Sequence, residues 1–322
     1  MSEPSIIRSR LRKAFVAVCL CAWLTLLWAR GGSLSQSAAQ GCGRAAPPGH
    51  ATEFTPHFAI AYDVPNEVLG RYLPEFERTH DSVIDFCARW DFAPMRADDR
   101  VDVMFLRSAA DLAALAAERR IEIGGNPSFF DPQKNLILLR LVEPAMAMHV
   151  LIRHEVAHAA MYRAGVHVSS AANPPWLVEG LACVFEVPQP LRNGALAVNP
   201  WRLADLTAAA DAPAQSNDQP PAPGLGTRPL RQLVTEASLF DARQGDQALL
   251  YAQSWALVHF LYAQDSAVFG DYLRRAASRR PREGIDASRE LLEFEAAFGP
   301  LTNELERRWS KEVHGWSAGA DD

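Results

Sequence analysis

Two histidines four residues apart, His154 and His158, constrain the fold of this chain more than any other feature. They open and close the run HEVAH, whose apolar neighbours predict a helix that ends at Gly165. Residues four apart on a helix lie one above the other on the same face. The two imidazoles therefore face a common point, as a tetrahedral zinc ion requires.

A third ligand is needed to complete such a site and leave one position open for water. The run NPPWLVEGLA predicts a second helix, with Asn173 as its N-cap and proline in its first turn. Glu179 lies on this helix, 21 residues after His158, which leaves room for a turn between two packed helices. We expect His154, His158 and Glu179 to bind one Zn²⁺.

Glu155 follows the first histidine by about 100° of helix rotation, beside the metal rather than on it. From that position its carboxylate can take a proton from a zinc-bound water, so we expect it to be the general base. The alternative is a chance motif, in which both histidines belong to the core or surface of an ordinary amphipathic helix.

HEVAH followed by WLVEGLA resembles the gluzincin metallopeptidases, the clan that contains thermolysin and aminopeptidase N. It is most similar to an uncharacterised bacterial peptidase-MA-like branch, loosely over residues 100–265. The resemblance implies an α+β, zincin-like domain that hydrolyses peptide bonds. Its parts would be a small mixed sheet, the HExxH helix, the glutamate helix and a helical C-terminal part. It also implies that Asn135–Leu141 is the edge strand along which an extended peptide binds.

Two further residues follow from the resemblance. Thermolysin-like members carry a carboxylate four residues after the third ligand, where this chain has Cys183. Glu186 or another acid could then support the zinc-bound histidine. Aminopeptidase-like members use a downstream tyrosine to donate a hydrogen bond to the oxyanion, and Tyr251 could play this part. Tyr251 equally fits the apolar stripe of a core helix.

Two other classes of function stay open. One is a catalytically weak zinc-binding domain that holds a peptide or an envelope partner, which the cysteine at position 183 motivates. The other is an envelope-anchored structural protein that binds no metal. The two zinc-binding hypotheses share the same ligands, so they differ only in turnover.

The first 30 residues predict export. A basic stretch, RSRLRK, precedes 16 uncharged residues, and this order is typical of a signal peptide. A helix of that length spans roughly 24 Å, short of the ~30 Å hydrocarbon core. A cleaved signal peptide and an uncleaved anchor both stay open. We favour the anchor because the small-residue cleavage site lies far beyond the apolar run. The body is then periplasmic or otherwise extracytoplasmic, attached to the inner membrane.

The net charge restricts the classes of partner that the protein can bind. The net charge is −6, and the first 45 positions carry six basic residues against one acidic residue, so the body is more acidic than the whole chain. This argues against nucleic acid as a partner. We expect a peptide or protein substrate, and membrane contact through the N-terminal segment alone. The sequence carries no signal for an oligomeric state.

Cys87 and Cys183 could form one disulfide or remain two buried thiols.

The chain divides into four parts by composition. We expect the signal or anchor at 1–30, a flexible linker at 31–52, an α/β sheet layer at 53–144 and a helical part at 145–322. Strands are predicted at 58–64, 101–106 and 135–141, with helices at 66–90 and 108–119. Later helices are predicted at 247–264, 268–277, 287–298 and 301–313. A Pro-rich loop, 211–229, interrupts them.

Overall fold

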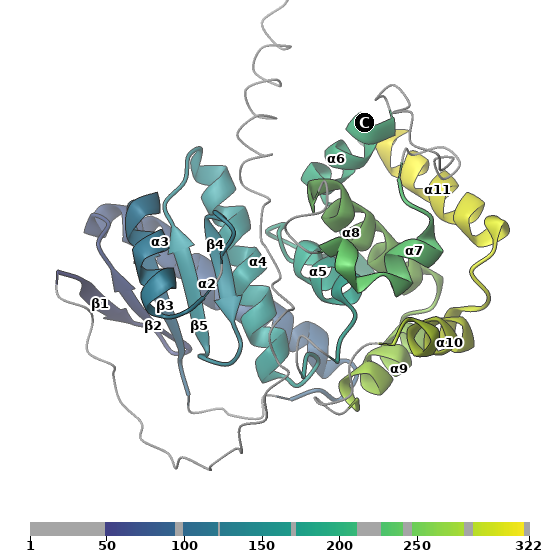
Figure 1. Ribbon diagram of the computed structural model, residues 1–322, viewed down its shortest axis with the longest axis horizontal. Coiled ribbons are helices and arrows are strands. Elements are labelled where there is room, and N and C mark those ends of the chain that lie inside the picture. Colours follow the sequence, from purple (N-terminus) through teal and green to yellow (C-terminus); the bar gives the residue numbers. More distant parts are fainter. Residues whose placement is uncertain are drawn as a thin grey trace, which may run out of the picture.

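The computed structural model describes residues 49–93, 99–121, 123–168, 172–210, 227–240, 247–279 and 286–318. A sheet with its covering helices lies on one side of the molecule and a group of helices on the other (Figure 1). The predicted α+β class with a small mixed sheet is confirmed. The predicted signal or anchor lies outside the described residues. Within those residues, no helix has the length and hydrophobicity needed to cross a bilayer.

The main sheet is mixed, with the strand order β1-β2-β3-β5-β4. The three central strands run parallel, and each outer strand runs antiparallel to its neighbour. The strands are β1 (Ala51–Phe54), β2 (Phe58–Tyr62), β3 (Val101–Leu106), β4 (Ser128–Asp131) and β5 (Leu136–Arg140).

The expectation that residues 135–141 form an edge strand is wrong. β5, within the predicted run 135–141, is an internal strand, and the edge is β4. The segment before β5 returns as a hairpin because Asp131 accepts hydrogen bonds from the backbone N–H groups of Gln133 and Lys134. Asn135 closes the turn with φ of 50°, a left-handed conformation that asparagine tolerates. The predicted linker is also too long, since its last two residues begin β1.

Helices cover both faces of the sheet. On one face lie α2 (Asn66–Ala88) and α4 (Ala145–Arg163), and on the other lies α3 (Ala109–Glu118). Ser108 caps α3 through a hydrogen bond from the N–H of Asp111. Alternate strand residues point to opposite faces. Phe130 of β4 accordingly packs with the α2 and α4 side, and Phe129 with the α3 side.

Helix α4 lies between the two halves of the molecule and is buried on nearly every side. Leu151, Ile152 and Val156 pack into the core beneath the sheet. Ala157 and Met161 pack into the core of the helical part. Each large apolar side chain buried in this way contributes roughly 1.5–3 kcal/mol, so α4 is fixed from both sides.

The remaining elements form the helical part around a buried central helix, α8 (Gln247–Gln264). The others are α5 (Pro175–Val184), α6 (Pro200–Ala210), α7 (Leu230–Thr235), a 3₁₀ turn (Ala237–Phe240), α9 (Ser266–Ala277), α10 (Ala287–Phe298) and α11 (Asn303–Ala318). A short hairpin, β6 (Leu191–Arg192) with β7 (Ala195–Leu196), packs against α8. The Pro-rich loop lies outside the described residues, except for its last three positions.

Helix α5 begins one residue later than predicted. Its N-cap is Pro174, and the side chain of Asn173 instead accepts a hydrogen bond from the N–H of Val168 in the preceding loop. Pro174 and Pro175 fix the backbone at the start of the helix, which has no side-chain cap. Asn173 therefore ties the loop after α4 to the start of α5.

Helices α5 and α8 cross at Gly180. A Cβ atom there would lie 2.6 Å from the carbonyl oxygen of Ser254 and 2.7 Å from Cγ2 of Val258. Only glycine permits this separation of the two backbones. Because Gly180 adjoins Glu179, the crossing also sets the depth of the Glu179 carboxylate.

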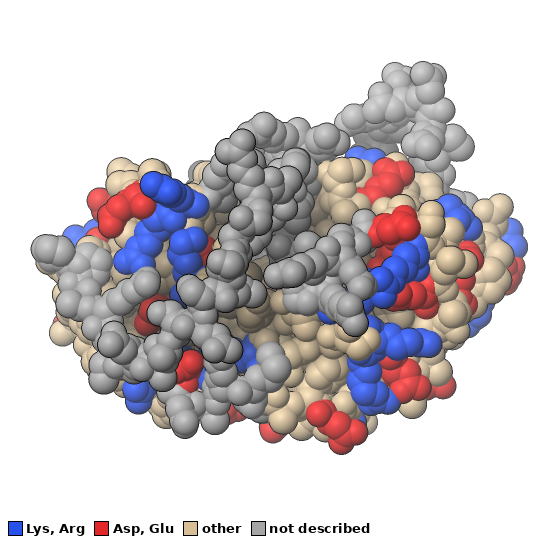
Figure 2. Space-filling model, turned by 60° about the horizontal axis from the view of Figure 1, so that its bottom comes forward, with Lys and Arg blue, Asp and Glu red and all other residues tan. Residues whose placement is uncertain are grey.

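The surface charges are interspersed rather than segregated. Figure 2 shows basic and acidic side chains side by side over the face in view. Many are neighbours on one helix turn, such as Arg289 with Glu293 and Arg307 with Glu304, each pair 2.6 Å apart. Exposed pairs of this kind contribute at most about 0.5 kcal/mol each, so the fold does not depend on them.

We predict that Gly180→Ala destabilises the protein by about 1–3 kcal/mol, because the added methyl group forces α5 away from α8. Urea unfolding measures this change. Gly70→Ala is the matched control, since Gly70 lies on α2 with open space around it. That substitution should be neutral or slightly stabilising. Equal stability of the two variants would show that the crossing is not tight.

Candidate metal centre

The side chains of α4 and α5 that the sequence singled out converge in the buried space between the two helices. Nε2 of His154 lies 3.0 Å from Nε2 of His158 and 3.2 Å from Oε2 of Glu179. Nε2 of His158 lies 3.6 Å from the same oxygen. Two imidazole nitrogens and one carboxylate oxygen therefore surround a single point and could hold a metal ion.

Glu179 has no ordinary partner for its oxygens. Its side chain is fully buried, and neither oxygen accepts a hydrogen bond of normal geometry from any residue that the structure describes. Burial opposes ionisation, but the charge of His158 and the contacts with both imidazoles outweigh it and lower the pKa of Glu179 to about 2. A positive charge beside a buried, ionised carboxylate offsets the cost of burying it, and a metal ion bound by the three side chains would supply that charge.

Glu186 supports the first histidine. Its Oε1 lies 3.0 Å from Nδ1 of His154, so Nδ1 donates the hydrogen bond and Nε2 keeps its lone pair toward Glu179. Glu186 lies in the turn after α5, three residues beyond Cys183. Of the two possibilities left by the sequence, Glu186 and not another acid holds this position.

Three side chains in turn hold Glu186. Arg202 of α6 donates Nε–H to Oε2 at 2.9 Å and pairs with Oε1 through Nη2. Asn199 donates to Oε2 at 2.8 Å, and Arg153 of α4 donates to the backbone carbonyl. Burial opposes the ionised form, but Arg202 and His154 lower the pKa of Glu186 to about 2. The support for His154 is therefore a fixed negative charge.

A second possible ligand group, His154 with Cys183 and Glu186, shares the first histidine. Cys183 and Cys87 are both free, buried thiols, which decides between the two options that the sequence left open. Burial raises the pKa of Cys183 to about 11, so it is a protonated thiol at neutral pH. Glu186 is already paired with Arg202. The group with Glu179 is thus better suited to a metal.

Glu155 of α4 contacts the edge strand β4 of the sheet. Its Oε1 accepts a hydrogen bond of 2.7 Å from the hydroxyl of Ser128, the first residue of β4. Both side chains are buried. Ser128 reaches Glu155 because strand residues alternate, which places it on the α4 side together with Phe130. Sequence reasoning missed Ser128 because its position depends on a pairing between β4 and α4.

Tyr251 of α8 lies beside the site. Its ring stacks on that of His154, with centroids 5.9 Å apart and planes 12° apart, and the Arg202 guanidinium lies 5.6 Å from its centroid. Tyr251 is buried. It therefore contacts a metal-site residue and also belongs to the core. Its role as a hydrogen-bond donor to an oxyanion stays a prediction.

His167 is a further polar group near the site. Its ring centroid lies 6.4 Å from that of His158, and its Nε2 is buried without a hydrogen-bond partner among the described residues. Burial and the charge of His158 lower the pKa of His167 to about 3, so the ring is neutral. No sequence spacing indicated this position, because the loop after α4 brings it back.

Two other histidines have separate partners. His149 of α4 pairs with Glu75 of α2, whose oxygen lies 2.9 Å from Nδ1. Nε2 of His259, on α8, lies 3.0 Å from the carbonyl oxygen of Leu196. Neither histidine belongs to a possible ligand group among the residues that the structure describes.

The comparisons with known proteins add one match. A family described as "Protein of unknown function (DUF1570)" matches residues 149–283. This range contains both histidines, Glu155, Glu179 and Tyr251. No curated protein matches the chain. The match assigns no activity, so the peptidase function implied by the sequence stays a prediction.

We predict that Arg202→Met lowers the free energy of unfolding by about 3–5 kcal/mol at pH 7, because it leaves the Glu186 carboxylate buried without its main counter-charge. The pKa of Glu186 is lowered from 4.5 to about 2. Its ionised form therefore stabilises the fold fully above pH 4.5 and loses that effect as the pH falls toward 2. The difference between variant and wild type should shrink at pH 3.

Urea unfolding in the presence of a chelator measures the change in the free energy of unfolding at pH 7 and at pH 3. Arg231→Met is the control, since Arg231 makes an exposed pair with Glu295 and should change stability by less than about 1 kcal/mol. An equally small effect of Arg202→Met would show that Glu186 is not held by charge.

Proposed function

We propose that the protein is a zinc-dependent metallopeptidase of the gluzincin type. The observation that carries the proposal is the convergence of His154, His158 and Glu179 on one buried point, with Glu155 directly after His154 on the same helix. We further propose that the N-terminal segment exports this domain and anchors it to the inner membrane.

The distances between the ligand atoms fit zinc. Ligands bonded to tetrahedral Zn²⁺ at about 2.0–2.1 Å lie about 3.3 Å from one another. The three distances here are 3.0, 3.2 and 3.6 Å. Imidazole and carboxylate are ligands that Zn²⁺ prefers, and two histidines with one glutamate form an open catalytic set. Bound zinc supplies Lewis acidity, which lets water act as a nucleophile at neutral pH.

Glu155 is the residue that moves the proton. Its carboxylate takes a proton from the attacking water and then passes it to the nitrogen of the leaving amine, which returns Glu155 to its ionised state. The hydrogen bond from Ser128 fixes Oε1 of Glu155 and so limits the rotation of the carboxylate. His154 is oriented in the same way by Glu186.

The substrate we propose is a peptide bound in extended form along β4. This strand is the edge of the sheet next to α4, so its outer backbone groups can pair with another strand. Ser128 of β4 contacts Glu155 directly, so a peptide paired with β4 would lie near the base. The peptide-binding strand is therefore β4 and not the predicted run 135–141, because β5 in that run is an internal strand.

We predict that His154→Ala and Glu179→Ala each lower the zinc content by one equivalent per chain. Glu155→Gln should keep that zinc and lose hydrolysis by at least about 10²-fold, because it removes the base but not a ligand. Plasma mass spectrometry measures the metal, and cleavage of a peptide library measures activity. His149→Ala is the matched control on the same helix.

The outcomes separate the classes of function. Unchanged zinc in His154→Ala and Glu179→Ala would refute the metal centre, and full activity in Glu155→Gln would refute the mechanism. Zinc bound by His154, His158 and Glu179 in a wild-type protein that binds peptides without turnover would favour the catalytically weak domain.

For the oxyanion we propose the hydroxyl of Tyr251. Tyr251→Phe keeps the ring that stacks on His154 and removes only the donor. We expect kcat to fall about 10²–10³-fold with zinc content and stability unchanged. His167→Gln is assayed beside it, since His167 is the other polar group near the site. Full activity in Tyr251→Phe with loss in His167→Gln would assign the role to His167.

A further inference from the structure

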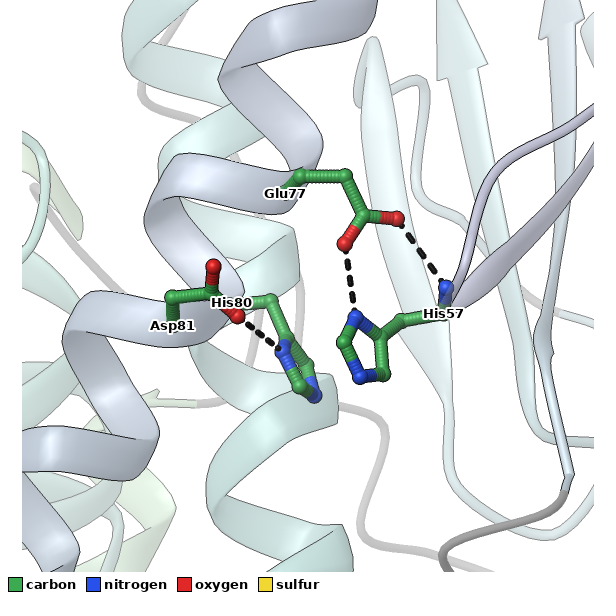
Figure 3. Close-up of side chains that lie close together, drawn as sticks. All are labelled: His57, Glu77, His80 and Asp81. Carbon is green, nitrogen blue, oxygen red and sulfur yellow. Dashed lines mark hydrogen bonds and ion pairs between the residues drawn. The ribbon is translucent and has the colours of Figure 1, made fainter.

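A second group of ligand-type side chains lies outside the metal centre, where α2 passes the beginning of β2 (Figure 3). His57 comes directly before β2, and Glu77, His80 and Asp81 lie on α2. The spacing of the three helical residues, i, i+3 and i+4, places them on one face. One ligand-type atom of each residue lies within 4.8 Å of one atom of every other.

Each imidazole is paired with a carboxylate through Nδ1. The distance is 2.6 Å from His57 to Oε2 of Glu77 and 3.2 Å from His80 to Oδ1 of Asp81. An ionised carboxylate can only accept, so Nδ1 of each ring carries the proton. In the neutral ring the lone pair is then on Nε2.

The two Nε2 atoms lie on the same side of the pair. The rings are stacked, with centroids 3.8 Å apart and planes 22° apart, and Figure 3 shows their second nitrogens beside each other, away from the carboxylates. No group in the described part of the chain is hydrogen-bonded to either Nε2 of His57 or His80. A histidine that binds a metal commonly donates its other N–H to a carboxylate. Both rings have this arrangement.

The charges around the rings and the partial exposure of His57 also suit a cation. Glu77 and Asp81 place two negative charges beside the rings, and these outnumber the single positive charge of Arg163, which acts on His80. The Glu77 carboxylate is held in place by a second hydrogen bond, from the backbone N–H of His57. His80 is buried, whereas the side chain of His57 is 33% exposed, so an ion could reach the pair of rings from the His57 side.

We propose that His57 and His80 form a second divalent-metal site, with Nε2 of each ring as ligand and water in the remaining positions. Glu77 and Asp81 hold the rings and balance the charge. Imidazole nitrogens suit Zn²⁺, Cu²⁺ and Ni²⁺. An ion bound here joins the start of β2 to α2, so its binding stabilises the folded protein.

The test uses the full chain with His154→Ala and Glu179→Ala combined, which removes the first site. Calorimetric titration with Zn²⁺ should show one equivalent bound, with a rise in Tm. Adding His57→Gln and His80→Gln should abolish both effects. Adding Glu77→Gln should weaken binding about 10–100-fold, since it removes the support of one ligand. His314→Ala is the control histidine and should change neither.

Two results would overturn the proposal: no saturable Zn²⁺ binding by the folded parent variant, or equal binding with His57 and His80 replaced. Should the parent variant fail to fold, the wild type replaces it, and His80→Gln should then hold one equivalent fewer. The second site does not depend on the peptidase function. Loss of zinc at His154 would leave the second equivalent in place.

Discussion

The burial of helix α4 from both sides is the constraint on which the rest of the structure depends. Its apolar residues join the core under the sheet and the core of the helical part, so the helix has almost no face toward water. Its polar residues Arg153, His154, Glu155 and His158 are then buried as well. Because burying a polar group without a partner costs several kcal/mol, other elements must supply partners.

Those partners come from four directions and join the two halves of the molecule. Arg153 contacts Glu75 of α2 and the backbone carbonyl of Glu186. Glu155 meets Ser128 of the edge strand, while the histidines face Glu179 of α5. Each contact orients a side chain that would otherwise rotate freely. The candidate metal centre and the packing of α4 are therefore one arrangement, since the same contacts pair the polar groups of the helix and orient the candidate ligands.

Most of the secondary structure could be predicted because local signals set it. Ser108 caps α3 as its side chain indicates, and α8 and α10 have their predicted bounds. The errors fall where a nonlocal contact decides. β4 was missed because four residues carry little pattern by themselves, and Asn173 bonds the preceding loop instead of capping α5. Pairing between distant segments overrides local preference at such positions.

The sequence by itself determined the candidate ligand set. Helical spacing aligns His154 with His158, and a predicted second helix carries Glu179, so local patterns were enough to single out all three residues. Only the tertiary structure decided which groups support them. Glu186 reaches His154 because α6 brings Arg202 to neutralise it, and Ser128 reaches Glu155 because β4 pairs outside β5. Supporting groups come from segments far apart in the chain, and their position depends on packing that no local pattern encodes.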